Sequence, residues 1–280
     1  QRLAPVGIQR TPVRYSAILR GMIEVLDLHK LYEGTQAVKG LSFSVQPGEV
    51  LGLVGPNGAG KTTTMRCITG IIPPSSGRVL ICGADVQADP IAAKQQLAFI
   101  PDEPRLFEYL SVREHLAFVA RLYGVKDPKP RAEALLDELE LRGKENALPN
   151  TLSRGMKQKL AIACGLIHEP RAILFDEPLT GLDPVAIRRI KETIRKRAAA
   201  GAAIIISSHL LNLVEAIATK ILLLQQGKKI LHGTLPEIQA SVPNLRANAD
   251  LEEIFMRATG YDEPATAGSP PEPDPGRAPE

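Results

Sequence analysis

The sequence predicts an α/β fold, in which buried strands alternate with helices. From residue 23 onward, short apolar runs recur between glycines and helical patterns, and several of them are apolar at nearly every position. Runs of this kind are typical of strands in a sheet that is covered on both faces. The expected strands are IEVLDLHKLY, LSFSV, EVLGLVG, RVLICG, LAFIPD, AILFDEP, AAIIISSH and KILLLQQGKKILHG.

The pattern changes between about residues 103 and 170, which we expect to form a helical insertion in the α/β core. SVREHLAFVARLYG begins with Ser111 and has Glu114 three residues later, the spacing of a capping box at a helix N-terminus. RAEALLDELELRG places apolar residues at helical spacing, at positions 132, 135, 136 and 139.

The chain divides further into a main domain and terminal segments of different composition. We expect residues 22–240 to form the main domain and residues 241–262 a short C-terminal helical segment. Residues 1–21 are interpreted as a flexible N-terminal extension. Residues 263–280 are rich in proline and in small or acidic residues, so we expect a disordered tail.

Composition and charge narrow the class of protein. The chain has 280 residues and a net charge of +3, so charge alone requires neither nucleic acid nor an anionic membrane as a partner. Cys67, Cys82 and Cys164 are far apart, which argues against a disulfide framework or a zinc site and suits a reducing cytosol. The apolar runs are far shorter than the ~20 residues of a membrane-spanning helix.

GPNGAGKTT, at residues 55–63, is the first motif that carries chemistry. It lies between the strand EVLGLV and the helical TMRCITG, and it matches the phosphate-binding pattern G-x-x-x-x-G-K-[ST] in the required context. Such a loop surrounds phosphate oxygens with backbone amides, and the following helix adds its positive dipole end. The candidate nucleotide-binding residues are Gly55, Pro56, Asn57, Gly58, Ala59, Gly60, Lys61, Thr62 and Thr63.

Three of these side chains have specific expected roles. Lys61 would neutralise charge on the β- and γ-phosphates, Thr62 would bind Mg²⁺, and Thr63 would add a phosphate contact. The alternative, a glycine turn that only begins a helix, is weaker because the strand, loop and helix are all present. A dinucleotide fold is not indicated, because the glycines do not follow G-x-G-x-x-G.

AILFDEP, at residues 172–178, ends an apolar strand in two carboxylates. Ligands of parallel sheets bind at the carboxyl ends of strands, where Asp176 and Glu177 fall. Alone, two acids here suit a helix N-cap equally well. Together with a phosphate loop, they suggest that Asp176 holds Mg²⁺ through water and that Glu177 activates the attacking water.

AAIIISSHLL is a second buried strand with a polar end, and His209 lies at that end. A single histidine is more often structural or solvent-facing than catalytic. Because this strand should belong to the same sheet, His209 can reach a γ-phosphate. We therefore include His209 with Glu177 and Lys61 among the candidate catalytic residues.

The order of the phosphate loop, LSRGMKQKL, AILFDEPLTGLDP and ISSH resembles that of the ATP-binding subunits of ABC transporters, over about residues 22–240. The resemblance implies a P-loop NTPase core of the ABC ATPase type, with an inserted helical subdomain and an N-terminal antiparallel β subdomain. Residues 22–240 are then the ABC ATP-binding domain, and ATP and Mg²⁺ are its implied cofactors.

The resemblance also implies roles for residues outside the phosphate loop. It assigns Tyr32 to stacking on adenine and Asp183, in TGLDP, to the D-loop, while His209 becomes the switch histidine. LSRGM stands where the family has its LSGGQ signature, so Ser153, Arg154 and Gly155 are expected to contact ATP on a partner subunit. Without the resemblance, Tyr32 is equally a core aromatic at a strand end, and TGLDP an ordinary turn.

Two positions depart from the family pattern. Asp102, in LAFIPDEP, stands where glutamine is usual, and it is a further candidate Mg²⁺ ligand, as a charged group instead of a neutral amide. In the signature, Arg154 and Met156 replace a glycine and a glutamine. Arg154 either adds charge toward the partner's ATP or points to solvent. These changes, and the ending DLEEIFMRATG, are similar to the ATPase subunits of exporters with a separate membrane polypeptide.

The implied function is an ATP-binding and ATP-hydrolysing subunit that powers an ABC transporter of the exporter type, through ATP-driven dimerisation with an identical or related ATP-binding subunit. Its other partner is an integral membrane permease subunit, which places the chain peripherally on the cytoplasmic face of the membrane. No nucleic acid partner is expected. The alternatives are a soluble ABC-class ATPase acting in a non-transport process and a non-catalytic nucleotide sensor, against which Glu177 and His209 argue.

Overall fold

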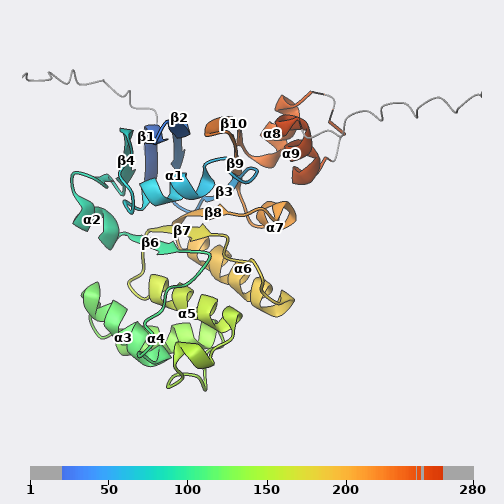
Figure 1. Cartoon of the computed structure of the whole chain (residues 1–280). Coiled ribbons are helices and arrows are strands. Elements are labelled where there is room, and N and C mark those ends of the chain that lie inside the picture. Colours follow the sequence, from blue (N-terminus) through green and yellow to red (C-terminus); the bar gives the residue numbers. More distant parts are fainter. Residues whose placement is uncertain (1–20, 244, 247–248, 261–280) are drawn as a thin grey trace, which may run out of the picture.

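The computed structural model describes residues 21–243, 245–246 and 249–260, and Figure 1 shows the arrangement of the elements. Residues 1–20 of the flexible extension expected at residues 1–21, and the disordered tail expected at residues 263–280, lie outside the described residues. None of the helices in the described part is long and apolar enough to cross a membrane.

A largely parallel sheet forms the centre of the described structure, with the spatial strand order β10-β9-β3-β8-β7-β6. Neighbouring strands run parallel except at the edge, where β10 is antiparallel to β9. The strands of this sheet are β3 Val50–Val54, β6 Leu97–Ile100, β7 Ala172–Asp176, β8 Ala203–Ser207, β9 Lys220–Gln225 and β10 Lys228–Gly233.

A second, antiparallel sheet has the order β2-β1-β4-β5. Its strands are β1 Ile23–Tyr32, β2 Thr35–Val45, β4 Ser76–Ile81 and β5 Ala84–Asp85. It confirms the antiparallel β subdomain that the family resemblance implies. LSFSV is only the second half of β2, which begins at Thr35 directly after the turn from β1.

The helix α1, Lys61–Ile68, lies between the two sheets (Figure 1). Strands β7 and β8 are buried at every position, so their alternate side chains meet different layers. Leu174 and Ile205 pack in the cluster that includes Met65 of α1 and the antiparallel sheet. Phe175 and Ile206 point to the opposite face, into a cluster with helices. The central sheet is therefore covered on both faces, as expected.

The helices on that opposite face follow β6 and β7 in the chain. They are α3 Val112–Leu122, α4 Pro128–Glu138, the short 3-10 helix η1 Pro149–Thr151, α5 Arg154–Leu166 and α6 Pro184–Ala199. The predicted capping box of α3 is confirmed: Ser111 Oγ accepts from the Glu114 amide at 3.3 Å, and Glu114 Oε2 accepts from the Ser111 amide at 2.7 Å. Leu135, Leu136 and Leu139 of the predicted α4 pattern are buried.

The remaining helices lie at the edges of the core. They are α2 Pro90–Gln95, α7 Leu211–Glu215, α8 Leu235–Ser241 and α9 Leu251–Thr259. Ile238 of α8 and Ile254 of α9 pack with Val214 of α7 and Leu223 of β9 in a third cluster. The apolar face of α9 is thus buried against β9, the strand next to the β10 edge of the central sheet.

Candidate functional site

The candidate residues converge at the carboxyl ends of four neighbouring strands. In the central sheet β3, β8, β7 and β6 are adjacent in that order. The phosphate loop follows β3, His209 lies two residues beyond β8, Glu177 directly follows β7, and Asp102 lies two residues beyond β6. The parallel topology therefore brings together residues that are far apart in the sequence.

The phosphate loop has a backbone that depends on glycine. Gly60, which precedes α1, has φ 102°, and a Cβ at this position would lie 2.5 Å from the carbonyl oxygen of Ala37. No side chain caps the N-terminus of α1, so the amides of its first turn remain available to an anion. Gly58, at the tip of the loop, is exposed and has open space where a Cβ would be.

Lys61 reaches back across this loop. Its Nζ donates to the carbonyl oxygen of Gly55 at 2.7 Å and to that of Pro56 at 3.3 Å, and the residue is only 8% exposed. Burial lowers the pKa of Lys61, while the negative charges of Glu177 and Asp176 oppose the shift. The ammonium group is thus held inside the loop and near both carboxylates.

The carboxylate of Glu177 is oriented by several donors. Its Oε2 accepts from His209 Nδ1 at 2.8 Å, from the His209 amide at 3.3 Å, from Ser208 Oγ at 3.2 Å and from Thr180 Oγ1 at 3.4 Å. Its backbone has φ 49°, an uncommon value for a residue other than glycine, and its amide donates to the carbonyl oxygen of Ser207 at 3.0 Å. The acid is therefore fixed at one place beyond β7.

The contact with Glu177 also determines the state of the His209 ring. A carboxylate only accepts hydrogen bonds, so His209 Nδ1 must carry the proton that is donated to Glu177. In the neutral ring, Nε2 is then an acceptor. The side chain is 53% exposed, which leaves it accessible to a ligand at the strand ends.

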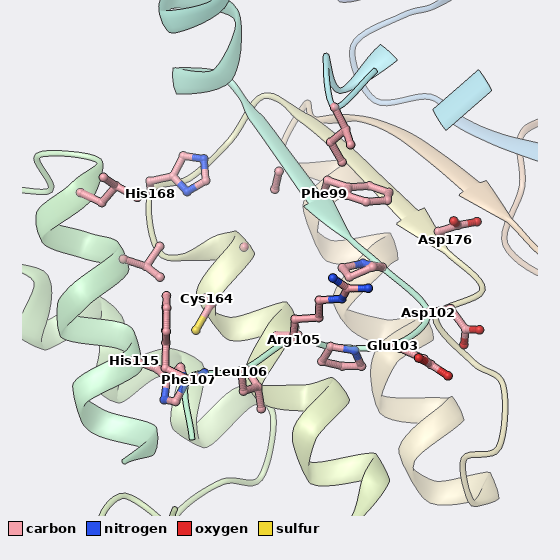
Figure 2. A pocket seen from close by; sticks show the side chains of 18 of the residues that line it. Phe99, Asp102, Glu103, Arg105, Leu106, Phe107, His115, Cys164, His168 and Asp176 are labelled. Carbon is pink, nitrogen blue, oxygen red and sulfur yellow. The ribbon is translucent and has the colours of Figure 1, made fainter. Parts of the chain in front are cut away.

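Asp176 and Thr62 provide groups that suit Mg²⁺. Asp176 is 7% exposed and accepts a hydrogen bond from the Ser207 hydroxyl, while Thr62 is exposed in the first turn of α1. Both line a cavity of about 980 Å³, together with Glu177 and Asp102. Figure 2 shows Asp176 and Asp102 on the same side of this cavity. Since Mg²⁺ is usually held by one or two carboxylates together with phosphate oxygens, these residues fit the ion.

Three further residues of the site were not singled out from the sequence. Ser207 contacts Asp176 and Glu177, and Ser208 and Thr180 both donate to Glu177. Ser207 and Ser208 are buried. The available signal was the position of two hydroxyl residues at the end of an otherwise apolar strand, in AIIISSH.

The residues assigned through the family resemblance lie at other places around the site. Tyr32 ends β1 and is 43% exposed, with Lys30 Nζ 5.0 Å from its ring centre, so it is not a buried core aromatic. Ser153 caps α5 by accepting from the Met156 amide at 3.2 Å. Asp183 caps α6 in the same way, through the Ala186 amide at 2.9 Å.

The N-terminus of α5 lies close to the TGLDP turn. Gly155 is half-buried, and a Cβ there would meet Leu182 at 3.6 Å. Leu152 and Leu160 are buried on either side of the exposed Ser153, as the signature pattern predicts. The motif therefore presents polar backbone and Ser153 outward while its leucines anchor the helix.

Arg154 is 57% exposed, and it makes a contact within the chain that the sequence did not indicate. Its Nη2 lies 3.5 Å from Asp102 Oδ1, in an ion pair within the chain. Burial raises the pKa of Asp102, the Arg154 guanidinium opposes this shift, and the charges of Glu177 and Asp176 add to it. Asp102 is thus directed toward Arg154 as well as toward the cavity.

Comparison with known proteins agrees with this geometry. The family model described as "ABC transporter" matches residues 38–180. The ABC-type transporter ATP-binding protein EcsA of Bacillus subtilis (strain 168) is 33% identical over 243 residues, which covers 86% of this chain and 98% of the relative. The SkfA peptide export ATP-binding protein SkfE of the same organism is 36% identical, with coverage of 78% and 91%.

Solved structures give the same result. A structure described as the ATP binding subunit of an ABC transporter has a TM-score of 0.81 and 35% identity, and covers 85% of this chain and 99% of that chain. The structure of cbiO1 from Clostridium perfringens, described as part of the ABC transporter complex cbiONQ, has a TM-score of 0.69 and 28% identity, with coverage of 79% and 91%. With its phosphate loop and its paired Asp176 and Glu177 at one edge of an ABC-type sheet, this chain belongs to the ABC transporter family, as an ATP-binding subunit.

Proposed function

We propose that the chain binds MgATP and hydrolyses it to power an ABC exporter. The observation that carries this proposal is the position of Glu177. Its carboxylate is held by His209, Ser208 and Thr180 at a strand end two strands away from the phosphate loop. A fixed carboxylate beside a phosphate site is the arrangement that a general base for water requires.

Each residue of the loop has a role in this proposal. The amides at the start of α1 bind phosphate oxygens, and the Lys61 ammonium exchanges its loop carbonyl contacts for contacts with the terminal phosphates. Thr62 and Asp176 hold Mg²⁺, which neutralises charge on the phosphate oxygens when bound. Tyr32, exposed at the end of β1, stacks on the adenine.

Glu177 and His209 act on the attacking water and the γ-phosphate. Glu177 accepts the water proton, and its four hydrogen bonds keep the carboxylate from turning away. The His209 ring, held through Nδ1, presents Nε2 toward the transferred phosphate, to which Nε2 donates a hydrogen bond when both ring nitrogens carry a proton. A nucleotide-sensing module would have no need of a carboxylate fixed in this way.

The second half of the site is supplied by another ATP-binding subunit. The amide-rich N-terminus of α5, with exposed Ser153 and half-buried Gly155, is suited to an anion, but it lies on the helical part of the chain. Two subunits arranged head to tail enclose two ATP molecules, each between a phosphate loop and the other subunit's signature. Asp183 is exposed at the N-terminus of α6 and directly follows Leu182, which lies beside Gly155. Hydrolysis then loosens the dimer.

The membrane permease subunit docks at the cavity between β6 and the helical insertion. This cavity joins the nucleotide side, at Asp102, to apolar side chains that are open to solvent. Phe107 is 55% exposed, Phe118 44% and Leu122 70%. A short amphipathic segment from the permease fits such a surface, because its apolar face would cover these side chains. The chain would thus act peripherally, on the cytoplasmic face of the membrane.

The export direction is supported by the printed descriptions of relatives. SkfE is described as a peptide export ATP-binding protein, and a 37% identical relative from Burkholderia pseudomallei (strain 1710b) as a Nod factor export ATP-binding protein. The alternative of a soluble ABC-class ATPase in a non-transport process makes different predictions about partners.

Two measurements test the proposal. The purified chain should release phosphate from ATP only in the presence of Mg²⁺, and an affinity-tagged chain should recover an integral membrane protein from detergent-solubilised membranes. Absence of Mg²⁺-dependent phosphate release would contradict the ATPase function. Active hydrolysis with recovery of nucleic acid or ribosomes instead of a membrane protein would favour the non-transport alternative.

A further inference from the structure

Two of the three motif positions at which this chain departs from its family, Asp102 and Arg154, lie beside each other. Asp102 follows β6, and Arg154 begins α5, so the two are distant in the sequence. In the structure, Arg154 Nη2 and Asp102 Oδ1 are 3.5 Å apart. The acidic and basic replacements therefore form an ion pair with each other.

Arg154 also packs on the TGLDP turn. Gly181, in this turn, has φ 70°, and a Cβ there would lie 3.0 Å from Arg154 Nη1 and 3.1 Å from Arg154 Cζ. The guanidinium group thus occupies the space that any larger residue at Gly181 would need. One side chain joins the signature helix, the turn after β7 and the loop after β6.

The surroundings of Arg154 explain why it needs a carboxylate. The first turn of α5 contains no acidic residue. A helix N-terminus carries partial positive charge, which disfavours a cation at this position unless an anion is close.

Asp102 lies near other acidic residues, and their negative charges disfavour its ionised carboxylate. The carboxylates of Glu103, Asp176 and Glu177 all act on it with negative charge. Its Oδ1 is shielded from solvent and accepts no hydrogen bond from the described residues. Arg154 is the cation that faces this oxygen, so each group compensates an unfavourable charge on the other.

We propose that Arg154 and Asp102 form a charge pair within one subunit that positions the N-terminus of the signature helix α5 against the Asp102 loop and the Gly181 turn. Arg154 is then a positioning residue that acts on its own chain and is not a ligand of ATP bound to a second subunit. Asp102 is the anchor of that contact. The inference rests on the proposed ATPase function. It adds that the Arg154–Asp102 pair helps to set the position of the signature residues at the start of α5.

We expect the Arg154–Asp102 pair to affect the position of the α5 N-terminus and not the stability of the whole chain. The two side chains are 57% and 44% exposed, and ion pairs at such exposure contribute little to the free energy of unfolding. Neither residue belongs to the phosphate loop. Loss of the pair should therefore leave nucleotide affinity intact and slow the step that depends on the position of α5.

A double-mutant cycle in the full chain tests this proposal. The proteins are the wild type, Arg154→Gln, Asp102→Asn and the double variant, compared by phosphate release and by affinity for a fluorescent ATP analogue. We expect each single variant to slow hydrolysis by about threefold to tenfold with unchanged affinity, and the double variant to be no slower than the slower single one. Lys157→Gln, which removes a charge one turn further along α5, is the matched control and should keep the wild-type rate.

Two outcomes of the hydrolysis measurements would overturn the proposal. If the losses multiplied in the double variant, Arg154 and Asp102 would act independently, for example Arg154 on a second subunit's ATP and Asp102 on the metal. If both single variants hydrolysed ATP at the wild-type rate, the pair would have no positioning role.

Hydrogen exchange of the backbone amides of residues 152–160, measured on the same four proteins, tests the proposal without an activity assay. Faster exchange in each single variant, with no further increase in the double one, is expected. Exchange equal to that of the wild type in both single variants would also overturn the proposal. A wild-type chain that released no phosphate while showing the expected exchange pattern would contradict the ATPase function and leave the charge pair supported.

Discussion

Glu177 Oε2 and His209 Nδ1 lie 2.8 Å apart, although 32 positions separate the two residues in the chain. The contact exists because β7 and β8 are adjacent and parallel, so that Asp176 pairs with Ser207 and the residues after both strands meet. This hydrogen bond holds the Glu177 carboxylate in place and also determines which nitrogen of His209 carries the proton. This relationship leads to the first prediction.

Glu177→Gln should slow ATP hydrolysis by about 10²-fold to 10⁴-fold, because an amide cannot accept the water proton as a carboxylate does. ATP binding should persist, since the phosphate loop is unchanged, and the ATP-bound dimer should accumulate. Phosphate release and size-exclusion chromatography with ATP measure the two effects. Glu252→Gln, on the exposed side of α9, is the control. An unchanged hydrolysis rate in Glu177→Gln would show that Glu177 is not the base.

Ser208→Ala should give a smaller loss than Glu177→Gln. The hydroxyl of Ser208 donates to Glu177 at 3.2 Å, so its removal loosens the carboxylate but leaves the His209 contact. Ser208 Oγ also accepts from the Leu210 amide at 3.1 Å, but only its bond to Glu177 acts on the base. We expect kcat to fall about threefold to tenfold from the loss of that bond, with unchanged affinity for ATP. Steady-state kinetics separate the two parameters. Ser76→Ala, at an exposed position of β4, serves as the control, and an equal rate in both variants would contradict a role for Ser208.

Much of this arrangement could be predicted from the sequence, because apolar strands and glycine loops leave strong local patterns. The phosphate loop and the strand-end acids were found in this way. The apolar runs alone did not separate the two sheets. In β1 the buried side chains Ile23 and Val25 alternate with half-buried ones, whereas β7 is buried throughout, and only this difference in period marks the antiparallel sheet.

The contacts between distant side chains were not predictable. The sequence left Arg154 either directed to a partner's ATP or exposed to solvent, and the structure pairs it with Asp102. The donors Ser208 and Thr180 were likewise missed, because their direction depends on how β8 and the turn after β7 approach Glu177. Such contacts follow from tertiary packing, which has no signature in local residue patterns.

Lys61→Ala should weaken nucleotide binding itself. The ammonium group lies inside the loop, and its loss removes a charged donor to the terminal phosphates. We expect the affinity for a fluorescent ATP analogue to fall about tenfold to hundredfold, the value of a hydrogen bond that involves a charged group. Lys228→Ala, at the exposed start of β10, is the control. Undiminished affinity in Lys61→Ala would contradict the assignment of the loop.

Gly60→Ala should damage both the loop and the fold around it. Alanine at φ 102° is strained by about 1–3 kcal/mol, and its Cβ would also lie 2.5 Å from the carbonyl oxygen of Ala37. Because that oxygen belongs to the backbone of β2, the clash can be relieved only by moving α1 or the antiparallel sheet. We expect a lower midpoint of urea unfolding and weaker binding of the ATP analogue.

The control for Gly60→Ala separates strain from collision. Gly83 has φ 84°, but nothing lies within 4 Å of a Cβ built on it. Gly83→Ala should therefore lower the unfolding midpoint only through the backbone strain of alanine at positive φ, and it should leave nucleotide affinity unchanged. If the two variants lost equal stability and both bound the analogue as the wild type does, the close approach of Gly60 to β2 would not shape the phosphate loop.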